Sequence, residues 1–132
     1  MGRREELEAL LKALYSIDIQ NDFTEDTVRL FAERNRWEPA TLDKVLSIMS
    51  KRETIDGYLS RHLKKWSISR IAVIDRNILR IGIYELLYEL QTPMKVIINE
   101  AIEIAKKYGT KDSFMFINAE LDAVAKEINR TL

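Results

Sequence analysis

Three glutamates and the single histidine have the types and spacing that could support catalysis or metal binding. Glu100 and Glu103 are three residues apart with Glu85 upstream, and di-iron helical bundles combine inward-facing glutamates with histidines. Such a bundle needs a glutamate followed three residues later by a histidine, and His62 does not stand in that pattern. The glutamates are therefore predicted to form a solvated helix face that pairs with nearby lysines.

Enzymatic activity is not predicted. His62 lies between Leu59 and Leu63 at the spacing of a helical core, so we interpret it as a packed or rim histidine rather than a general base. The 132 residues include no cysteine, which excludes a disulfide framework and argues against a zinc site. Glycine-rich phosphate loops and the G-x-S-x-G elbow are also missing from the sequence. We expect no catalytic residue, no metal and no cofactor.

A phenylalanine outside the predicted core indicates a binding function. In the last segment Phe114, Ile117 and Leu121 recur at the spacing of a helical core stripe. Phe116 lies off this stripe, on one line with Glu120, and is therefore predicted to project from a polar face. An aromatic ring on a polar face could contact a ligand. Packing against a neighbouring helix or a chain terminus is the alternative, and the sequence leaves both open.

The elements that carry these side chains are predicted to be helices throughout. Apolar residues recur every three or four positions, and four glycines and two prolines are too few for a β-sandwich or barrel. We expect an all-α domain of six or seven helices. The segment after residue 70 is apolar nearly all round and should be the buried central helix. The predicted helices lie near residues 7–17, 25–31 with Thr24 as cap, 39–49, 55–66 (a fourth helix or a bent extension of the third), 71–87 capped by Ser67 or Ser69, 93–108 after Thr92 and before a positive-φ stop at Gly109, and 113–128.

Charge is balanced over the chain but not along it. Acidic and basic residues number 21 each, while residues 51–80 carry a net charge of +5. This basic segment could meet an anionic partner, although a solvated helix face is the simpler interpretation. The chain has no apolar run of about 18 residues, so no membrane association is expected. A cysteine-free composition fits a cytoplasmic protein.

Three stretches of the second half carry a distinctive pattern. They read D-R-N-I-L-R-I-G-I-Y-E-L at residues 75–86, P-M-K-V-I-I-N-E-A-I-E-I-A-K-K-Y-G at 93–109 and S-F-M-F-I-N-A-E-L-D at 113–122. In this order and spacing they resemble the NusB family of transcription antitermination factors, over about residues 66–127. The first half is less similar, although L-Y-S-I-D at 14–18 resembles the end of the family's first helix.

The sequence departs from the family pattern in two places. The usual arginine-rich opening is reduced to Arg3 and Arg4, and three glutamates follow at positions 5, 6 and 8. Ala119 and Glu120 stand where the family usually has a glycine and an aliphatic residue. Because counterion release scales with the phosphates neutralised, we expect weaker RNA binding than in a typical member.

The resemblance implies a fold of two packed helical subdomains, which we place at residues 1–65 and 66–132. It also implies a function: binding of the single-stranded boxA element of ribosomal RNA transcripts together with NusE, a protein of the small ribosomal subunit. Other Nus factors and RNA polymerase then join this pair, and the polymerase reads through terminators.

The family's motifs place the expected sites residue by residue, and each has a structural alternative. Arg3 and Arg4 could contact phosphates, but the neighbouring glutamates compete for them. Tyr15 could contact a base or pack at the rim of the core. Asn118 could contact a base, or cap or bridge helices. Asp75 and Arg76 are the expected NusE contacts, unless they pair within their own helix. The expected RNA contacts are Arg3, Arg4, Tyr15, Asp112, Ser113, Phe116 and Asn118, of which Asp112 and Ser113 are also candidate helix caps.

A second function remains open from the sequence. The acidic first helix is compatible with a NusB-like module that has kept protein binding or forms a homodimer, with RNA binding weakened or lost. Partner-enhanced binding of a boxA-type RNA would distinguish the antitermination role from this alternative.

Overall fold

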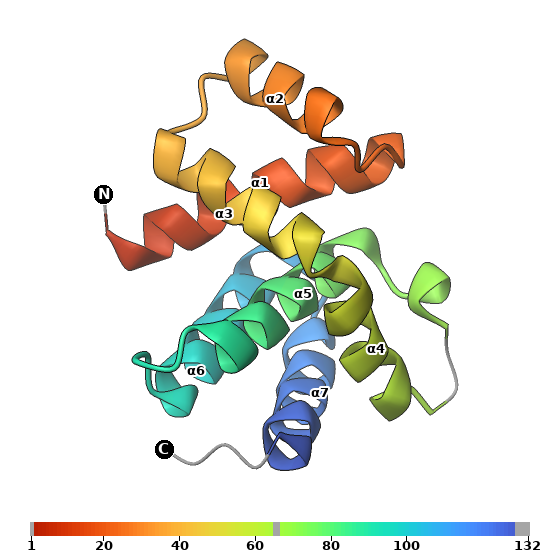
Figure 1. The fold of residues 1–132 in the computed structure, drawn as a ribbon. Helices are drawn as coiled ribbons and strands as arrows, with labels where there is room; N and C mark the ends of the chain where they lie inside the picture. The colour runs from red at the N-terminus through yellow and green to blue at the C-terminus, as the bar shows by residue number, and fades with distance from the viewer. Residues whose placement is uncertain (1, 65–66, 129–132) are drawn as a thin grey trace. The chain divides into compact units, whose positions relative to one another are not determined.

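The computed structural model describes residues 2–64 and 67–128, and helices joined by short loops make up these ranges. The all-α fold class is confirmed, with seven α-helices and a short 3-10 helix in the described part of the chain (Figure 1). The helices are α1 (Arg3–Gln20), α2 (Glu25–Arg34), α3 (Pro39–Ser50), α4 (Arg52–His62), α5 (Val73–Tyr88), α6 (Met94–Tyr108) and α7 (Ser113–Glu127), with the 3-10 helix η1 (Ile68–Arg70) before α5.

The chain divides into two compact units, Met1–Lys51 and Arg52–Leu132. The first contains α1, α2 and α3, and the second contains α4, η1, α5, α6 and α7. We expected a boundary at residues 65 and 66, which would have assigned α4 to the first unit. Instead α4 packs on α5 and α7, because its Ile55 and Leu59 are fully buried. The fourth helix is thus separate from the third, and Trp66, expected at its end, lies outside the described residues.

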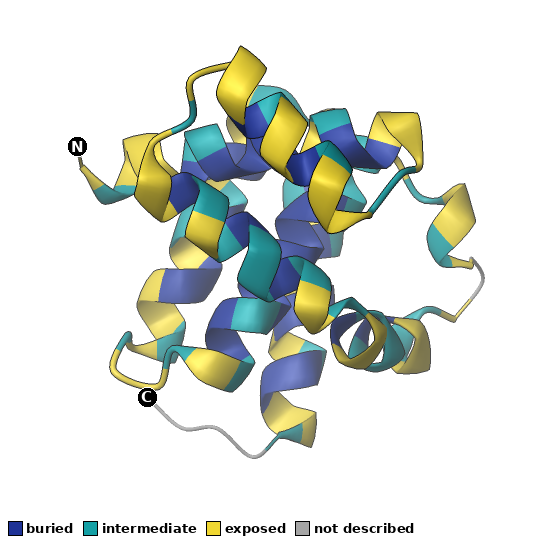
Figure 2. Cartoon of the chain, turned by 45° about the horizontal axis from the view of Figure 1, so that its top comes forward, coloured by how far each residue is buried: buried dark blue, intermediate teal, exposed yellow. Residues whose placement is uncertain are grey.

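In the first unit, local signals set the helix ends. Thr24 caps α2 as expected, because its hydroxyl accepts a hydrogen bond from the backbone N–H of Thr27 at 3.3 Å. Pro39 occupies the first turn of α3, where its missing N–H is harmless. Buried and exposed stripes alternate along the helices (Figure 2). The buried leucines of α1 are Leu7, Leu10, Leu11 and Leu14.

The turn after α2 places an arginine where glycine is favoured. Arg36 has φ 52°, in the left-handed region. The N–H of Arg36 donates to Glu33 O at 3.3 Å, and that of the next residue, Trp37, donates to Ala32 O at 3.0 Å. These two bonds form a Schellman motif, which usually carries glycine at its left-handed position. An L side chain in this conformation costs about 1–2 kcal/mol.

In the second unit, α5 is the central helix, as its apolar sequence predicts. It contacts α4, α6 and α7, and buries nine of its residues. The expected cap at Ser67 or Ser69 is wrong: α5 begins at Val73 with Ala72 as its N-cap. The chain first makes the 3-10 turn η1 and an extended residue, Ile71, so both serines lie in or before η1.

Gly82 on α5 lets α7 approach closely. A methyl group added there would come within 2.8 and 2.9 Å of the two terminal carbons of Leu121, which is fully buried. We predict that Gly82→Ala lowers the free energy of unfolding by about 1 kcal/mol, because overpacking outweighs the higher helix propensity of alanine. Urea unfolding would measure this change. Gly57→Ala on α4 is the control, since only the tip of Arg61 lies near that position; equal changes for both variants would contradict the packing argument.

A charged pair joins α4 to the centre of the second unit. Arg80 on α5 donates from Nε to Asp56 Oδ1 at 2.9 Å and from Nη2 to Asp56 Oδ2 at 3.0 Å. The Arg80 side chain is only 7% exposed and that of Asp56 is 23% exposed. Asn77 accepts a third bond from Arg80 at 3.2 Å. The arginine of the sequence motif is therefore held inside the fold.

Candidate RNA-binding and partner surface

A pocket of about 200 Å³ in the second unit brings two of the predicted site residues together. Phe116 of α7 and Asp75 of α5 line it with Arg70 and Ile71 from the segment before α5. The packing of α5 on α7 sets the first pair, and the turn at η1 brings the other two beside the first turn of α5. Sequence reasoning had assigned Phe116 to RNA and Asp75 to a protein partner, and it missed Arg70 and Ile71. Only the excess of basic residues over 51–80 pointed towards Arg70.

Asp75 is an unusual acceptor in this pocket. Burial raises the pKa of its carboxyl above the ordinary value, and a hydrogen bond from the Ser113 side chain offsets part of this rise. Its Oδ1 is buried without a hydrogen-bond partner among the described residues. This oxygen is therefore an unpaired acceptor that is shielded from solvent, which is consistent with the raised pKa of the carboxyl.

Ser113 has a structural place rather than an exposed one. It is 2% exposed, and its Oγ accepts a hydrogen bond from the backbone N–H of Thr110 at 2.9 Å. Gly109 does not adopt the positive φ that we expected; its φ is −93° and its ψ −170°. A Cβ at Gly109 would lie 2.5 Å from Ser113 Oγ, so the glycine makes room for this serine. Ser113 is thus placed to hold the side chain of Asp75 by a hydrogen bond.

The face of α7 that carries Phe116 was predicted to be polar and solvated, but part of it is buried in the structure. Glu120 is 9% exposed, and its Oε2 has no hydrogen-bond partner among the described residues. Glu127 accepts from Arg61 Nη2 at 2.6 Å and lies 2.6 Å from His62 Nε2, so this line of α7 packs against α4. His62 is accordingly a rim residue, as interpreted. Phe116 is half-buried at the end of this line, with part of its ring lining the pocket.

Glu120 provides a stability test with a defined pH dependence. Burial raises its pKa, although the charges of His62 and Lys64 partly oppose this, so its ionised form destabilises the fold at neutral pH. We predict that Glu120→Leu, which restores an aliphatic residue, raises the free energy of unfolding by about 1–2 kcal/mol at pH 7. The charge-related part of this gain should shrink as the pH falls through the raised pKa, which thermal unfolding at several pH values would measure.

Glu127→Gln is the control with the opposite sign. The hydrogen bond from Arg61 lowers the pKa of Glu127, so Glu127 stabilises the fold above its unfolded pKa and loses this effect as the pH falls through its folded pKa. The variant should therefore be less stable than the parent at neutral pH and equal to it in acid. A Glu120→Leu variant less stable than the parent at pH 7 would contradict the burial argument.

Near the pocket, α7 offers exposed polar and apolar side chains. Asp112 precedes the helix but makes no capping hydrogen bond, which removes its expected structural role. Asn118 is exposed, and Met115 is 63% exposed. Phe114, expected in the core, is half-buried beneath the Lys106 ammonium, 5.2 Å from the ring centroid. Asp112 and Asn118 are therefore placed where an external ligand could meet them.

The structural alternative for Asp75 and Arg76 was a pair within α5 that involves Arg80. Asp75 does not form it. Arg80 binds Asp56 on α4 instead, while Arg76 Nη1 donates to Ile68 O at 3.5 Å. Arg76 is half-buried and steadies the turn at η1. Both residues of the predicted partner contact thus lie at the first turn of α5, beside the pocket.

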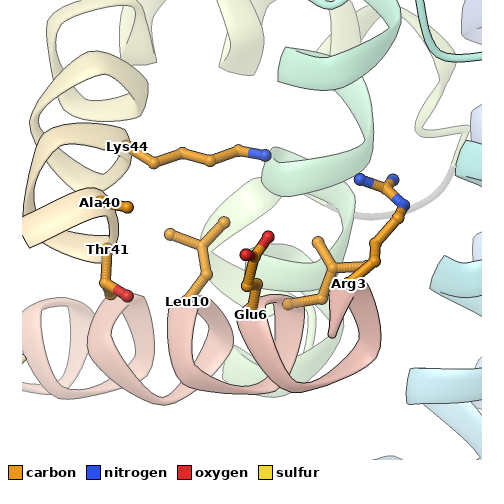
Figure 3. A pocket seen from close by; sticks show the side chains of 7 residues that line it. Arg3, Glu6, Leu10, Ala40, Thr41 and Lys44 are labelled. Carbon is orange, nitrogen blue, oxygen red and sulfur yellow. The ribbon is translucent and has the colours of Figure 1, made fainter. Parts of the chain in front are cut away.

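The remaining predicted RNA contacts belong to the first unit. Tyr15 is 38% exposed on α1, and Arg4 is exposed. Arg3 is half-buried and lines a small pocket of about 90 Å³ together with Glu6 and Lys44 (Figure 3). Of the predicted competing residues, Arg3 and Glu6 thus line one pocket.

The pocket of the second unit has the chemistry of a binding site. It offers an aromatic ring and an exposed cation beside the half-buried Asp75, and these are the groups that can stack on a base and meet its phosphate. The described residues contain no cluster of metal-binding side chains. No helix within them is long and apolar enough to cross a membrane. Fold and site thus define an all-helical binding module.

Comparison with known proteins identifies the family of this module. The chain belongs to the NusB family, whose model matches residues 4–126. The transcription antitermination protein NusB of Thermodesulfovibrio yellowstonii is 38% identical, with 96% of this chain and 93% of that protein covered. NusB of Thermotoga maritima is 56% identical over 73 residues, a match that spans 55% of this chain and about half (51%) of that relative.

Solved structures agree on the fold. The structure of T. maritima NusB has a TM-score of 0.80 and 37% identity, and the match covers 96% of this chain and 92% of that one. A structure described as antitermination factors NusB and NusE in complex with dsRNA has a TM-score of 0.75. Its identity is 22%, and the match covers 95% of this chain and 96% of that chain, so it supports the fold alone.

Proposed function

We propose that this protein is a transcription antitermination adaptor. In this role it binds a boxA-type single-stranded segment of ribosomal RNA transcripts together with the ribosomal protein NusE. The complex then supports terminator read-through by RNA polymerase, together with other Nus factors. The protein acts in the cytoplasm, performs no catalysis and needs no cofactor.

The observation that carries this proposal is the pocket formed by Phe116, Asp75 and Arg70. A flat ring beside an exposed cation suits a stacked base and its phosphate, which Phe116 and Arg70 provide at this pocket. Asp112 and Asn118, both exposed, extend this chemistry along α7. Asp75 and Arg76, at the first turn of α5, contact the NusE partner in this proposal.

The relatives support the same function. The T. yellowstonii protein, similar over nearly its whole length, bears the name of a transcription antitermination protein. The solved complex of NusB and NusE with dsRNA shows that a protein of this fold joins these partners. Extending that function to this chain is the proposal.

Fluorescence anisotropy of a labelled boxA-type RNA tests it. The RNA is titrated with this protein alone and with NusE, at two salt concentrations. We expect binding that NusE strengthens and salt weakens, because phosphate contacts release counterions. A scrambled RNA of equal length is the control. Equal affinity for both RNAs, or no binding in the presence of NusE by a folded protein, would overturn the proposal.

A protein-binding or homodimeric module remains the second candidate, favoured by the acidic start of α1. Glu5 and Glu6 lie in its first turn, and Glu6 stands beside Arg3. If these glutamates prevent RNA binding, the protein should not bind the RNA. Its molar mass in light scattering should then rise to that of a dimer as the protein concentration increases. A monomer that binds boxA-type RNA excludes this candidate.

A further inference from the structure

We propose that a groove in the first unit binds the nucleotides that flank the boxA-type segment. This inference rests on the proposed function and extends the RNA-binding surface beyond the expected sites. The groove measures about 370 Å³ and lies between α1 and the turn from α2 to α3. Its volume is in the range of small-ligand sites. The lining residues that the argument uses are Lys12, Ser16, Asn35, Arg36 and Trp37.

Arg36 is the first sign that this groove has a ligand. Its backbone is left-handed within a complete Schellman motif, a position at which glycine would carry no steric penalty. The arginine side chain is exposed and lines the groove. Residues held in strained backbone conformations cluster at ligand sites. We therefore expect the guanidinium of Arg36 to bind a ligand in the groove.

The groove combines the groups that single-stranded RNA requires. Lys12 and Arg36 place two cations on its lining, and Trp37, half-buried, supplies an aromatic ring. Non-specific binders of single strands pair cations for the backbone with aromatic rings for the bases. Glu38 also lines the groove and reduces its positive charge. An acidic peptide would use the cations but would leave the tryptophan without a stacking partner, so the chemistry favours RNA.

The groove continues the predicted RNA surface along α1. Tyr15, an expected base contact, is 38% exposed and three residues after Lys12. Ser16, which lines the groove, is four residues after Lys12. Residues three and four apart lie on one helix face, so Tyr15 lies next to Lys12 at the edge of the groove. A strand that stacks on Tyr15 therefore reaches the groove with its next nucleotides.

Two RNAs separate this inference from the proposed function. One is the boxA-type segment alone, and the other carries about five further nucleotides at each end, within the usual site sizes for single strands. Anisotropy with NusE present should give about fivefold tighter binding of the longer RNA, with a steeper salt dependence. The double variant Lys12→Gln/Arg36→Gly should lose this gain and keep its affinity for the short RNA.

The variants are chosen so that misfolding cannot imitate the result. Arg36→Gly relieves the left-handed backbone and should keep or raise the melting temperature. Arg34→Gln removes an exposed arginine of α2 that does not line the groove, and should keep the gain. A gain that survives in the double variant, or that is missing from the parent, overturns the inference and leaves the proposed function intact.

Two further outcomes are also decisive. If the parent binds neither RNA, the proposed function fails, and the inference fails with it. If the double variant keeps the gain from the longer RNA but loses affinity for NusE, the groove is a protein site and the inference is wrong.

Discussion

Asp56→Ala is expected to lower the free energy of unfolding by about 3 kcal/mol, because it removes the carboxylate that accepts two hydrogen bonds from the buried guanidinium of Arg80. Arg80 is 7% exposed, and two of its hydrogen bonds end on Asp56, at 2.9 and 3.0 Å. The bond from Arg80 to Asn77 ends on a neutral amide, which does not balance the charge of the guanidinium. Urea unfolding followed by circular dichroism measures the loss.

A double variant distinguishes lost charge pairing from lost packing. In Asp56→Leu/Arg80→Met both charges are replaced by apolar side chains, and buried pairs replaced in this way often recover much of the stability. We expect the double variant to be more stable than Asp56→Ala. Asp122→Ala, which removes half of an exposed pair with Lys126, should change stability by less than about 0.5 kcal/mol. Equal losses for Asp56→Ala and Asp122→Ala would contradict the buried-pair argument.

Phe116→Ala is expected to weaken binding of a boxA-type RNA by roughly tenfold to a hundredfold in the presence of NusE. Stacking on an aromatic ring is worth about 1–3 kcal/mol per base, and Phe116 is the aromatic side chain of the pocket with Asp75 and Arg70. Because the ring is half-buried, some folding stability is lost as well. The affinities must therefore be measured below the melting temperature of the variant.

Met115→Ala is the matched control for this prediction. Met115 is the preceding residue of α7, is also apolar, and is 63% exposed without lining the pocket. Its removal should change the RNA affinity by less than about threefold, since surface substitutions away from a site have small effects. Equal losses in the two variants would mean that α7 contacts the RNA without a specific stacking position at Phe116.

Local patterns in the sequence predicted most of the fold. The apolar spacing identified the helices, and Thr24 and Pro39 marked the starts of α2 and α3, because capping acts over a few residues. The prediction of a helix start failed where more than one nearby residue could have been the cap. Ser67 and Ser69 had the right residue type for a cap, but the chain turned through η1 before α5 began.

The candidate site was less predictable than the fold. The motifs singled out Phe116 and Asp75 separately, and only their common pocket indicates that they could serve one ligand. Asp112 and Asn118 remain predictions of RNA contacts, now with exposed positions. Ser113 was plausible from its place at a helix start, but packing against Gly109 buries it.

The sequence by itself determined the all-α class, the helices and membership of the NusB family, since these depend on residue periodicity and on motifs contained in short segments. Only the tertiary structure decided which charges are paired and which groups are buried. Arg80 meets Asp56 across 24 positions and Arg61 meets Glu127 across 66, and Glu120 is buried because α7 packs on α4. Such burial depends on partners distant in the chain, which no local pattern encodes.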